Sequence, residues 1–153
     1  MNALELKIPP PLVLLIFAIA MWFAAPMSEP LHVSLGVRIG MAIALAVIGE
    51  GISLAGIIRF RRAKTTINPM KAKNASSLVT SGVYRFTRNP MYLGLVITLV
   101  GWGVFLPSPI GLLLIPLFAL YITRFQITPE ERVLTSIFGR EYVDYKNRVR
   151  RWV

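Results

Sequence analysis

The sequence contains no cysteine and a single histidine, His32. Without cysteine the chain has no disulfide, no thiolate ligand and no thiol nucleophile, and one histidine is too few for a multi-histidine metal site. We therefore expect no metal centre. Acidic residues are also scarce, seven against 17 lysines and arginines, which gives a formal net charge of +10. Few residues are thus available for any function that needs a carboxylate.

Apolar residues, in contrast, make up 55% of the chain, and the mean hydropathy of +0.62 exceeds that of an ordinary soluble domain. A charge of +10 suits either a nucleic acid or the anionic face of a bilayer. The long apolar segments favour the bilayer and argue against a nucleic-acid partner. A length of 153 residues indicates one domain, residues 1–153.

The apolar segments predict four membrane-spanning helices, at about residues 8–27, 35–60, 89–106 and 108–124. The first holds 20 uncharged residues, enough to cross a hydrocarbon core of about 30 Å. We interpret it as a span and not as a cleaved signal, because the region before it holds Glu5 against a lone Lys7. The second contains Glu50, an intramembrane acid and hence a functional candidate whose role no signature assigns.

The last two segments predict a helical hairpin, because Pro107-Ser108-Pro109 interrupts 35 uncharged residues and prolines belong at a turn. The flanking segments 61–88 and 125–153 are rich in lysine and arginine and should face the cytoplasm by the positive-inside rule. Both termini are then cytoplasmic. We expect a multi-pass protein of a prokaryotic cytoplasmic membrane.

The segment after Thr128 predicts an amphipathic helical tail. Its apolar residues recur with a helical period on both sides of Gly139. Such a tail cannot form a core alone and must pack against the ends of the spans or lie on the membrane surface. The predicted fold class is an all-α membrane protein with four transmembrane helices and a C-terminal amphipathic cytoplasmic tail.

The third predicted span begins at an unusual place. Asn89 is a typical N-cap and Pro90 a typical first helical residue. A helix that begins there points its free N–H groups and the positive end of its dipole toward Arg85 and Arg88. This arrangement favours the binding of an anion at the start of the helix.

Several motifs resemble a known superfamily. The run RNPMYLG from Arg88, the Gly101-Trp-Gly103 motif, the Glu130-Glu131 pair and the ending FGREYVDYKNRVRRW are similar to the membrane methyltransferases that include isoprenylcysteine carboxyl methyltransferases and phospholipid N-methyltransferases. The resemblance extends from about Arg59 to the C-terminus. Asn89 stands where the isoprenylcysteine branch usually has histidine. The resemblance implies S-adenosylmethionine as methyl donor and a lipophilic acceptor from the bilayer.

A methyl donor of this kind carries a carboxylate and an ammonium. The helix start at Arg88, Asn89 and Pro90 suits the carboxylate, and Glu130 and Glu131 suit the ammonium. On residue physics alone Glu131 has another explanation, since Thr128 and Glu131 have the spacing of a helix-capping box. One glutamate would then cap the helix while the other binds the ligand.

Gly101 and Gly103 coincide with the Gly-x-Gly that phospholipid methyltransferases use beside the cofactor, and Tyr92 is on the same helix face, where its ring could hold adenine or ribose. The alternatives are ordinary ones: small residues let membrane helices approach, and tyrosine often anchors at the interface.

The acceptor remains open between two chemistries. A carboxylate needs a cation, for which Arg124, Arg148 or Arg150 are available, whereas an amine needs a base, for which Glu131 or Glu50 are available. We favour carboxyl methylation of an isoprenylcysteine-like compound slightly over amine methylation of a phospholipid. A non-catalytic membrane protein with a basic tail that binds lipid or a partner is the alternative from another class. The oligomeric state is left open.

Overall fold

The computed structural model describes residues 5–64 and 76–153, and all regular structure in these residues is helical. The helices are α1 (Pro10–Ala24), α2 (Leu35–Arg62), α3 (Pro90–Phe105), α4 (Pro109–Ile122), α5 (Thr128–Phe138) and α6 (Arg140–Arg148). Short 3-10 turns occur at Ala25–Met27 and Gly82–Arg85, and a π-helical turn occurs at Thr123–Ile127. The sequence also has turn signals at Asn68-Pro69 and Asn74, and these lie outside the described residues.

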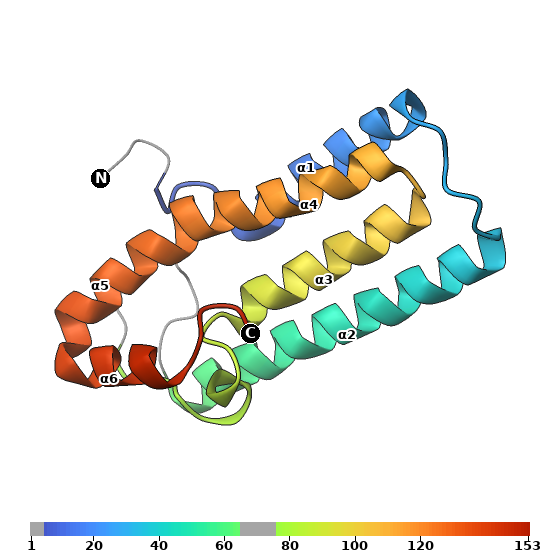
Figure 1. Cartoon of the computed structure of the whole chain (residues 1–153). Coiled ribbons are helices and arrows are strands. Elements are labelled where there is room, and N and C mark those ends of the chain that lie inside the picture. Colours follow the sequence, from blue (N-terminus) through green and yellow to red (C-terminus); the bar gives the residue numbers. More distant parts are fainter. Residues whose placement is uncertain (1–4, 65–75) are drawn as a thin grey trace.

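The first four helices lie side by side, with α3 between α2 and α4 (Figure 1). Three helical stretches are long and apolar enough to cross a membrane: Pro10–Met27, Leu35–Arg62 and Pro109–Phe138. The last has 30 residues, or about 45 Å, so its charged part from Arg124 on extends beyond a hydrocarbon core of about 30 Å. Helix α3 has only 16 residues, or about 24 Å, which is shorter than a hydrocarbon core of about 30 Å. These are the lengths and compositions of a multi-pass membrane protein. The predicted third span, residues 89–106, thus corresponds to this shorter apolar helix, which lies between α2 and α4 (Figure 1).

The predicted hairpin turn is present. Helix α3 ends at Phe105 and α4 begins at Pro109, as the interrupting prolines indicated. The Ser108 hydroxyl accepts a hydrogen bond from the Gly111 N–H at 3.2 Å and so caps α4. Ser108 also bonds the Ser28 hydroxyl at 3.0 Å, which joins this turn to the link between α1 and α2.

Helices α2 and α3 pack more closely than any large side chain would permit. A Cβ at Gly49 would lie 2.6 Å from the Gly94 carbonyl oxygen, and Gly101 faces the Ala42 carbonyl in the same way. The Ser53 hydroxyl donates to the Met91 carbonyl at 3.3 Å across this interface. Close backbone approach through small residues is the usual way in which membrane helices associate. It fixes the start of α3 against the end of α2.

The helix that contains α4 does not stop at Arg124. It passes through the π-helical turn into α5, which makes one continuous helix from Pro109 to Phe138. The capping box predicted at Thr128 is therefore wrong, because the backbone of Thr128 is already helical. Its hydroxyl instead donates to the Thr123 carbonyl at 2.8 Å.

The tail folds back at Gly139, whose φ of 52° separates α5 from α6. Tyr142 and Tyr145 of α6 are buried against Val79 and Tyr84 of the segment before α3. The Tyr145 hydroxyl donates to the Tyr84 carbonyl at 2.8 Å. In Figure 1 the α5–α6 pair therefore closes the same end of the bundle from which α3 begins.

The link between α1 and α2 and the α5–α6 region lie at opposite ends of the bundle (Figure 1). We predict that they lie on opposite sides of the membrane. His32 and Ser136 are exposed, and the chain has no cysteine of its own. In intact cells, a membrane-impermeant maleimide should label His32→Cys, whereas Ser136→Cys should react only after permeabilisation, because the basic segments stay inside. Labelling of both variants from the outside would contradict this arrangement.

Candidate functional site

The site is organised by a buried carboxylate that two arginines share. Glu131 of α5 is 7% exposed. Its Oε2 accepts from Arg151 Nη2 at 2.7 Å, its Oε1 accepts from Arg151 Nε at 3.1 Å, and Arg88 Nη2 lies 3.1 Å from Oε1. The two bonds from Arg151 form a bidentate pair, the strongest arrangement between arginine and a carboxylate. Glu131 thus joins the segment before α3, helix α5 and the C-terminal end.

Hydrogen bonds to main-chain carbonyls also hold two of these segments together, the one before α3 and the C-terminal end. The Asn89 side-chain amide donates to the Arg151 carbonyl at 2.9 Å, and the Thr87 hydroxyl donates to that carbonyl at 3.3 Å. The Arg88 N–H donates to the Arg150 carbonyl at 3.0 Å. Asn89 occupies the N-cap position and Pro90 the first turn, as predicted, but the Asn89 side chain makes no capping bond. Its amide holds the C-terminal segment instead.

Arg88 has hydrogen-bonding capacity that the protein does not use. Its side chain is 9% exposed, and Nε and Nη1 have no partner among the described residues. Buried donors without acceptors are costly, and guanidinium donors more so than neutral ones. Arg88 and Arg151 bring two positive charges to the single negative charge of Glu131. The cluster is therefore suited to receive one more anionic group at Arg88.

Glu130 differs from Glu131 in its partners and in its pKa. It has no ion pair in the described part of the chain, and its Oε2 accepts from the Tyr92 hydroxyl at 3.1 Å. Burial raises the pKa of the Glu130 carboxyl to about 7, the Tyr92 bond partly offsets this rise, and the charge of Glu131 adds to it. Glu130 therefore lies near its titration midpoint at neutral pH, and a bound cation would favour its ionised form.

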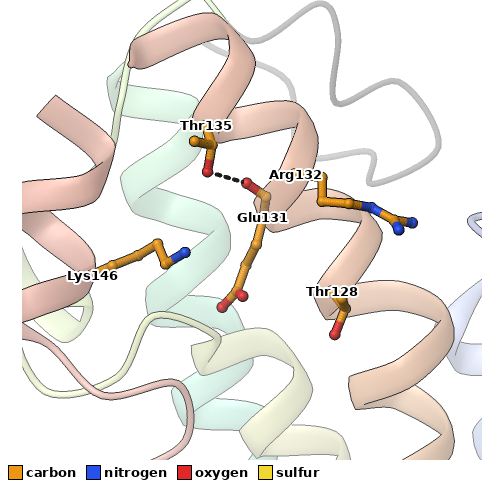
Figure 2. A pocket seen from close by; sticks show the side chains of 5 residues that line it. All are labelled: Thr128, Glu131, Arg132, Thr135 and Lys146. Atoms are coloured by element: carbon orange, nitrogen blue, oxygen red, sulfur yellow. Dashed lines mark hydrogen bonds between the residues drawn. The ribbon is translucent and has the colours of Figure 1, made fainter. Parts of the chain in front are cut away.

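A pocket of about 330 Å³ opens beside Glu131 and is lined by Thr128, Glu131, Arg132, Thr135 and Lys146. Figure 2 shows the Glu131 carboxylate and the Lys146 ammonium pointing into the same space, from α5 and α6 respectively. The Thr135 hydroxyl donates a hydrogen bond to the Glu131 main-chain carbonyl at 2.6 Å. The pocket thus presents charged groups on a helical frame.

The other residues singled out in the sequence lie elsewhere. Arg124 Nη1 bonds Glu5 at 3.0 Å, and Arg132 shares the same carboxylate. Arg148 is exposed and lines a different pocket, together with Arg85. Neither Arg124 nor Arg148 makes a hydrogen bond or ion pair with Glu131 among the described residues. The structure therefore does not join the catalytic candidates Glu131, Arg124 and Arg148 by such bonds.

Gly101 and Gly103 lie near the far end of α3, about 18 Å along the helix from its start. Gly101 packs on α2, whereas a Cβ at Gly103 would lie 2.8 Å from the Leu112 side chain of α4. The Tyr92 ring is buried in the apolar core and only its hydroxyl reaches Glu130. The geometry of these residues is that of helix packing, and Tyr92 in addition positions a carboxylate.

Arg151 was not identified from the sequence, although it makes the closest contact to Glu131. The only available signal was that a basic ending, Arg148 to Arg151, follows an acid pair in a chain with few acids. Glu50 is exposed on α2 and makes no hydrogen bond or ion pair with any residue that the structure describes.

Comparison with known proteins finds a matching family model and several similar methyltransferases. The model of the phospholipid methyltransferase family matches residues 37–141. Protein-S-isoprenylcysteine O-methyltransferase B of Arabidopsis thaliana is 36% identical over 110 residues, which are 70% of this chain and 54% of that protein. A probable protein-S-isoprenylcysteine O-methyltransferase of Oryza sativa is 33% identical over 112 residues, 71% of this chain and 57% of that protein. The enzyme of that name in Mus musculus is 35% identical over 109 residues, 69% of this chain and 37% of that protein. The chain spans about half the length of the plant relatives.

We predict that Glu131→Gln lowers the free energy of unfolding by about 3 kcal/mol, because it leaves the buried Arg88 charge without its counter-ion. Thermal or denaturant unfolding in detergent measures the change. Glu141→Gln is the matched control, since Glu141 is exposed on α6 and its replacement should cost less than about 0.5 kcal/mol. Equal stability of the two variants would show that the cluster does not hold the tail.

Proposed function

Because the chain belongs to the phospholipid methyltransferase family, whose model covers residues 37–141, we propose that it is an integral-membrane enzyme that transfers a methyl group from S-adenosylmethionine to a lipophilic acceptor. The observation that carries the proposal is the pair of unused, buried Arg88 donors next to an acid pair. The donor molecule supplies an electrophilic methyl group on a sulfonium, and its amino-acid end carries one carboxylate and one ammonium.

The two ends of that amino acid match two different groups of the site. Arg88 Nε and Nη1 would bind the carboxylate through charge-assisted hydrogen bonds. Glu130, once ionised, would bind the ammonium, while the Tyr92 hydroxyl keeps its carboxylate in place. Glu131 already faces two guanidinium groups. Its role is therefore to position Arg88 and to hold the C-terminal segment, and it does not itself bind the ligand.

Two acceptor chemistries follow from the site. The names of the relatives favour carboxyl O-methylation of an isoprenylcysteine-like compound. An ionised carboxylate needs no base, so the protein has only to orient it and to balance its charge. Lys146, whose ammonium points into the pocket (Figure 2), offers that balance. Arg124 is less suitable, because it is already paired with Glu5.

The alternative acceptor is a phospholipid amine, and one observation favours it. A carboxyl with a pKa of about 7 is suited to accept a proton from an ammonium that must become nucleophilic. Glu130 would then act on the acceptor as well as on the methyl donor. A non-catalytic role in lipid or partner binding gives no reason for the unused donors of Arg88.

The acceptor enters from the bilayer, on this proposal, while the water-soluble methyl donor arrives from the cytoplasm. The basic end of α2, with Arg59, Arg61 and Arg62, is at the same end of the bundle as α5 and α6 (Figure 1). This supports a cytoplasmic location for the site and for both termini.

We predict that the affinity for S-adenosylhomocysteine, measured by calorimetric titration in detergent, falls about tenfold per pH unit below pH 7. The sign follows from Glu130: its raised pKa of about 7 means that it must lose a proton to bind an ammonium, and this costs free energy only below that pH. Above pH 7 the affinity should be level with respect to this group.

Glu130→Gln is the matched variant, because it keeps the shape and the Tyr92 contact. It should bind more weakly than the wild type at pH 8 and show no dependence on pH between 5.5 and 7. Wild-type affinity in this variant would remove Glu130 from the cofactor site. Absence of any binding by the wild-type protein would contradict the proposed function as a whole.

A further inference from the structure

A second pocket, of about 340 Å³, lies between the segment before α3 and the C-terminal half of α6. It is lined by Thr80, Ser81, Arg85, Tyr145, Arg148 and Val149, and no acidic side chain lines it. Both arginines are exposed. The pocket is formed by a different set of residues from the one beside Glu131, so it can be tested separately.

The two arginines of this pocket have no acidic partner in the part of the chain that the structure describes. Neither Arg85 nor Arg148 has an ion pair among the described residues, whereas Glu5 and Glu131 together pair with four other arginines. Arg148 Nε donates to the Asp144 carbonyl at 3.3 Å, and this bond leaves the terminal nitrogens free. The pocket therefore carries positive charge that nothing in the described part of the chain neutralises.

A third guanidinium adds to this charge. The Arg59 side chain lies against Gly82, where an added Cβ would be 2.8 Å from Arg59 Cζ. Gly82 has a φ of 65° and directly follows Ser81, which lines the pocket. Three like charges around one short segment repel one another and are stabilised by a multivalent oxygen anion, for which Thr80 and Ser81 add hydroxyl donors.

The position of the pocket indicates where that anion comes from. Phe86 follows Arg85 in the chain and is 75% exposed, the highest value for any phenylalanine that the structure describes. Arg59 belongs to the last turn of the apolar helix α2. Arginines at the end of a span attract anionic lipid headgroups, and an exposed apolar ring beside them can contact the adjoining acyl chains. We propose that this pocket binds the phosphate group of an anionic bilayer lipid, with Phe86 against its acyl chains. The inference does not depend on methyl transfer.

The test compares the protein in neutral phosphatidylcholine nanodiscs with and without phosphatidylglycerol, and measures retained lipid by native mass spectrometry and the unfolding temperature. The wild type should retain phosphatidylglycerol and unfold at a higher temperature when it is present. Arg85→Gln with Arg148→Gln should weaken the lipid affinity roughly 25-fold, at about fivefold per arginine, and should abolish the temperature shift.

Arg61→Gln with Arg62→Gln is the matched control, because it removes the same charge from exposed residues at the end of α2 that do not line the pocket. It should keep most of the lipid effect. A far-UV circular dichroism spectrum and an unfolding temperature in neutral nanodiscs equal to those of the wild type would show that the test variant is folded. Equal loss in both double variants would overturn the proposal in favour of diffuse charge attraction. Equal stabilisation of the wild type in neutral nanodiscs by inorganic phosphate would overturn the lipid as its source.

Discussion

The contact between Glu131 and the two arginines Arg88 and Arg151 holds together parts of the chain that would otherwise separate. The segment before α3 and the last residues of the chain both carry an excess of positive charge and repel one another, whereas helix α5 supplies two acids, Glu130 and Glu131. One buried carboxylate between two guanidinium groups reverses this locally, and the carbonyl groups of Arg150 and Arg151 can then accept from Arg88, Asn89 and Thr87. Together with the packing of Tyr142 and Tyr145 against the segment before α3, this contact holds the tail at the end of the bundle.

The positions of the site residues are fixed by the packing of the apolar helices. Glycines at the α2–α3 interface allow the two backbones to touch, which fixes where α3 begins and therefore where Arg88 and Tyr92 lie. Because Tyr92 is held in the core, its hydroxyl keeps Glu130 in one orientation. We therefore propose separate roles for two adjacent glutamates: Glu131, paired with two arginines, positions them, whereas Glu130, with a pKa raised to about 7, responds to the ligand. This division connects the fold to the proposed chemistry.

Much of the fold could be predicted from the sequence, since apolar runs and prolines act locally. The helix boundaries at Leu35, Pro90 and Pro109 agree with the prediction to within a residue or two. The capping box at Thr128 was wrong because the sequence does not show that a π-helical turn carries the preceding helix through that position.

The site was less predictable, because it depends on contacts between distant segments. With 17 basic residues in the chain, charge alone could not select Arg151 as the partner of Glu131. The Gly101-Trp-Gly103 spacing is compatible both with cofactor binding and with helix packing, so the sequence could not distinguish the two. The structure shows that Gly101 packs against Ala42 and Gly103 against Leu112.

The central claim is that a site closed by the tail methylates a molecule that enters from the bilayer. The most direct measurement supplies radiolabelled S-adenosylmethionine to the reconstituted protein with a prenylcysteine analogue, with total membrane lipid, or with a short water-soluble acid. The account predicts transfer of label to a lipophilic acceptor, the prenylcysteine analogue first, and little transfer to the soluble acid. Efficient methylation of the soluble acid alone would contradict it.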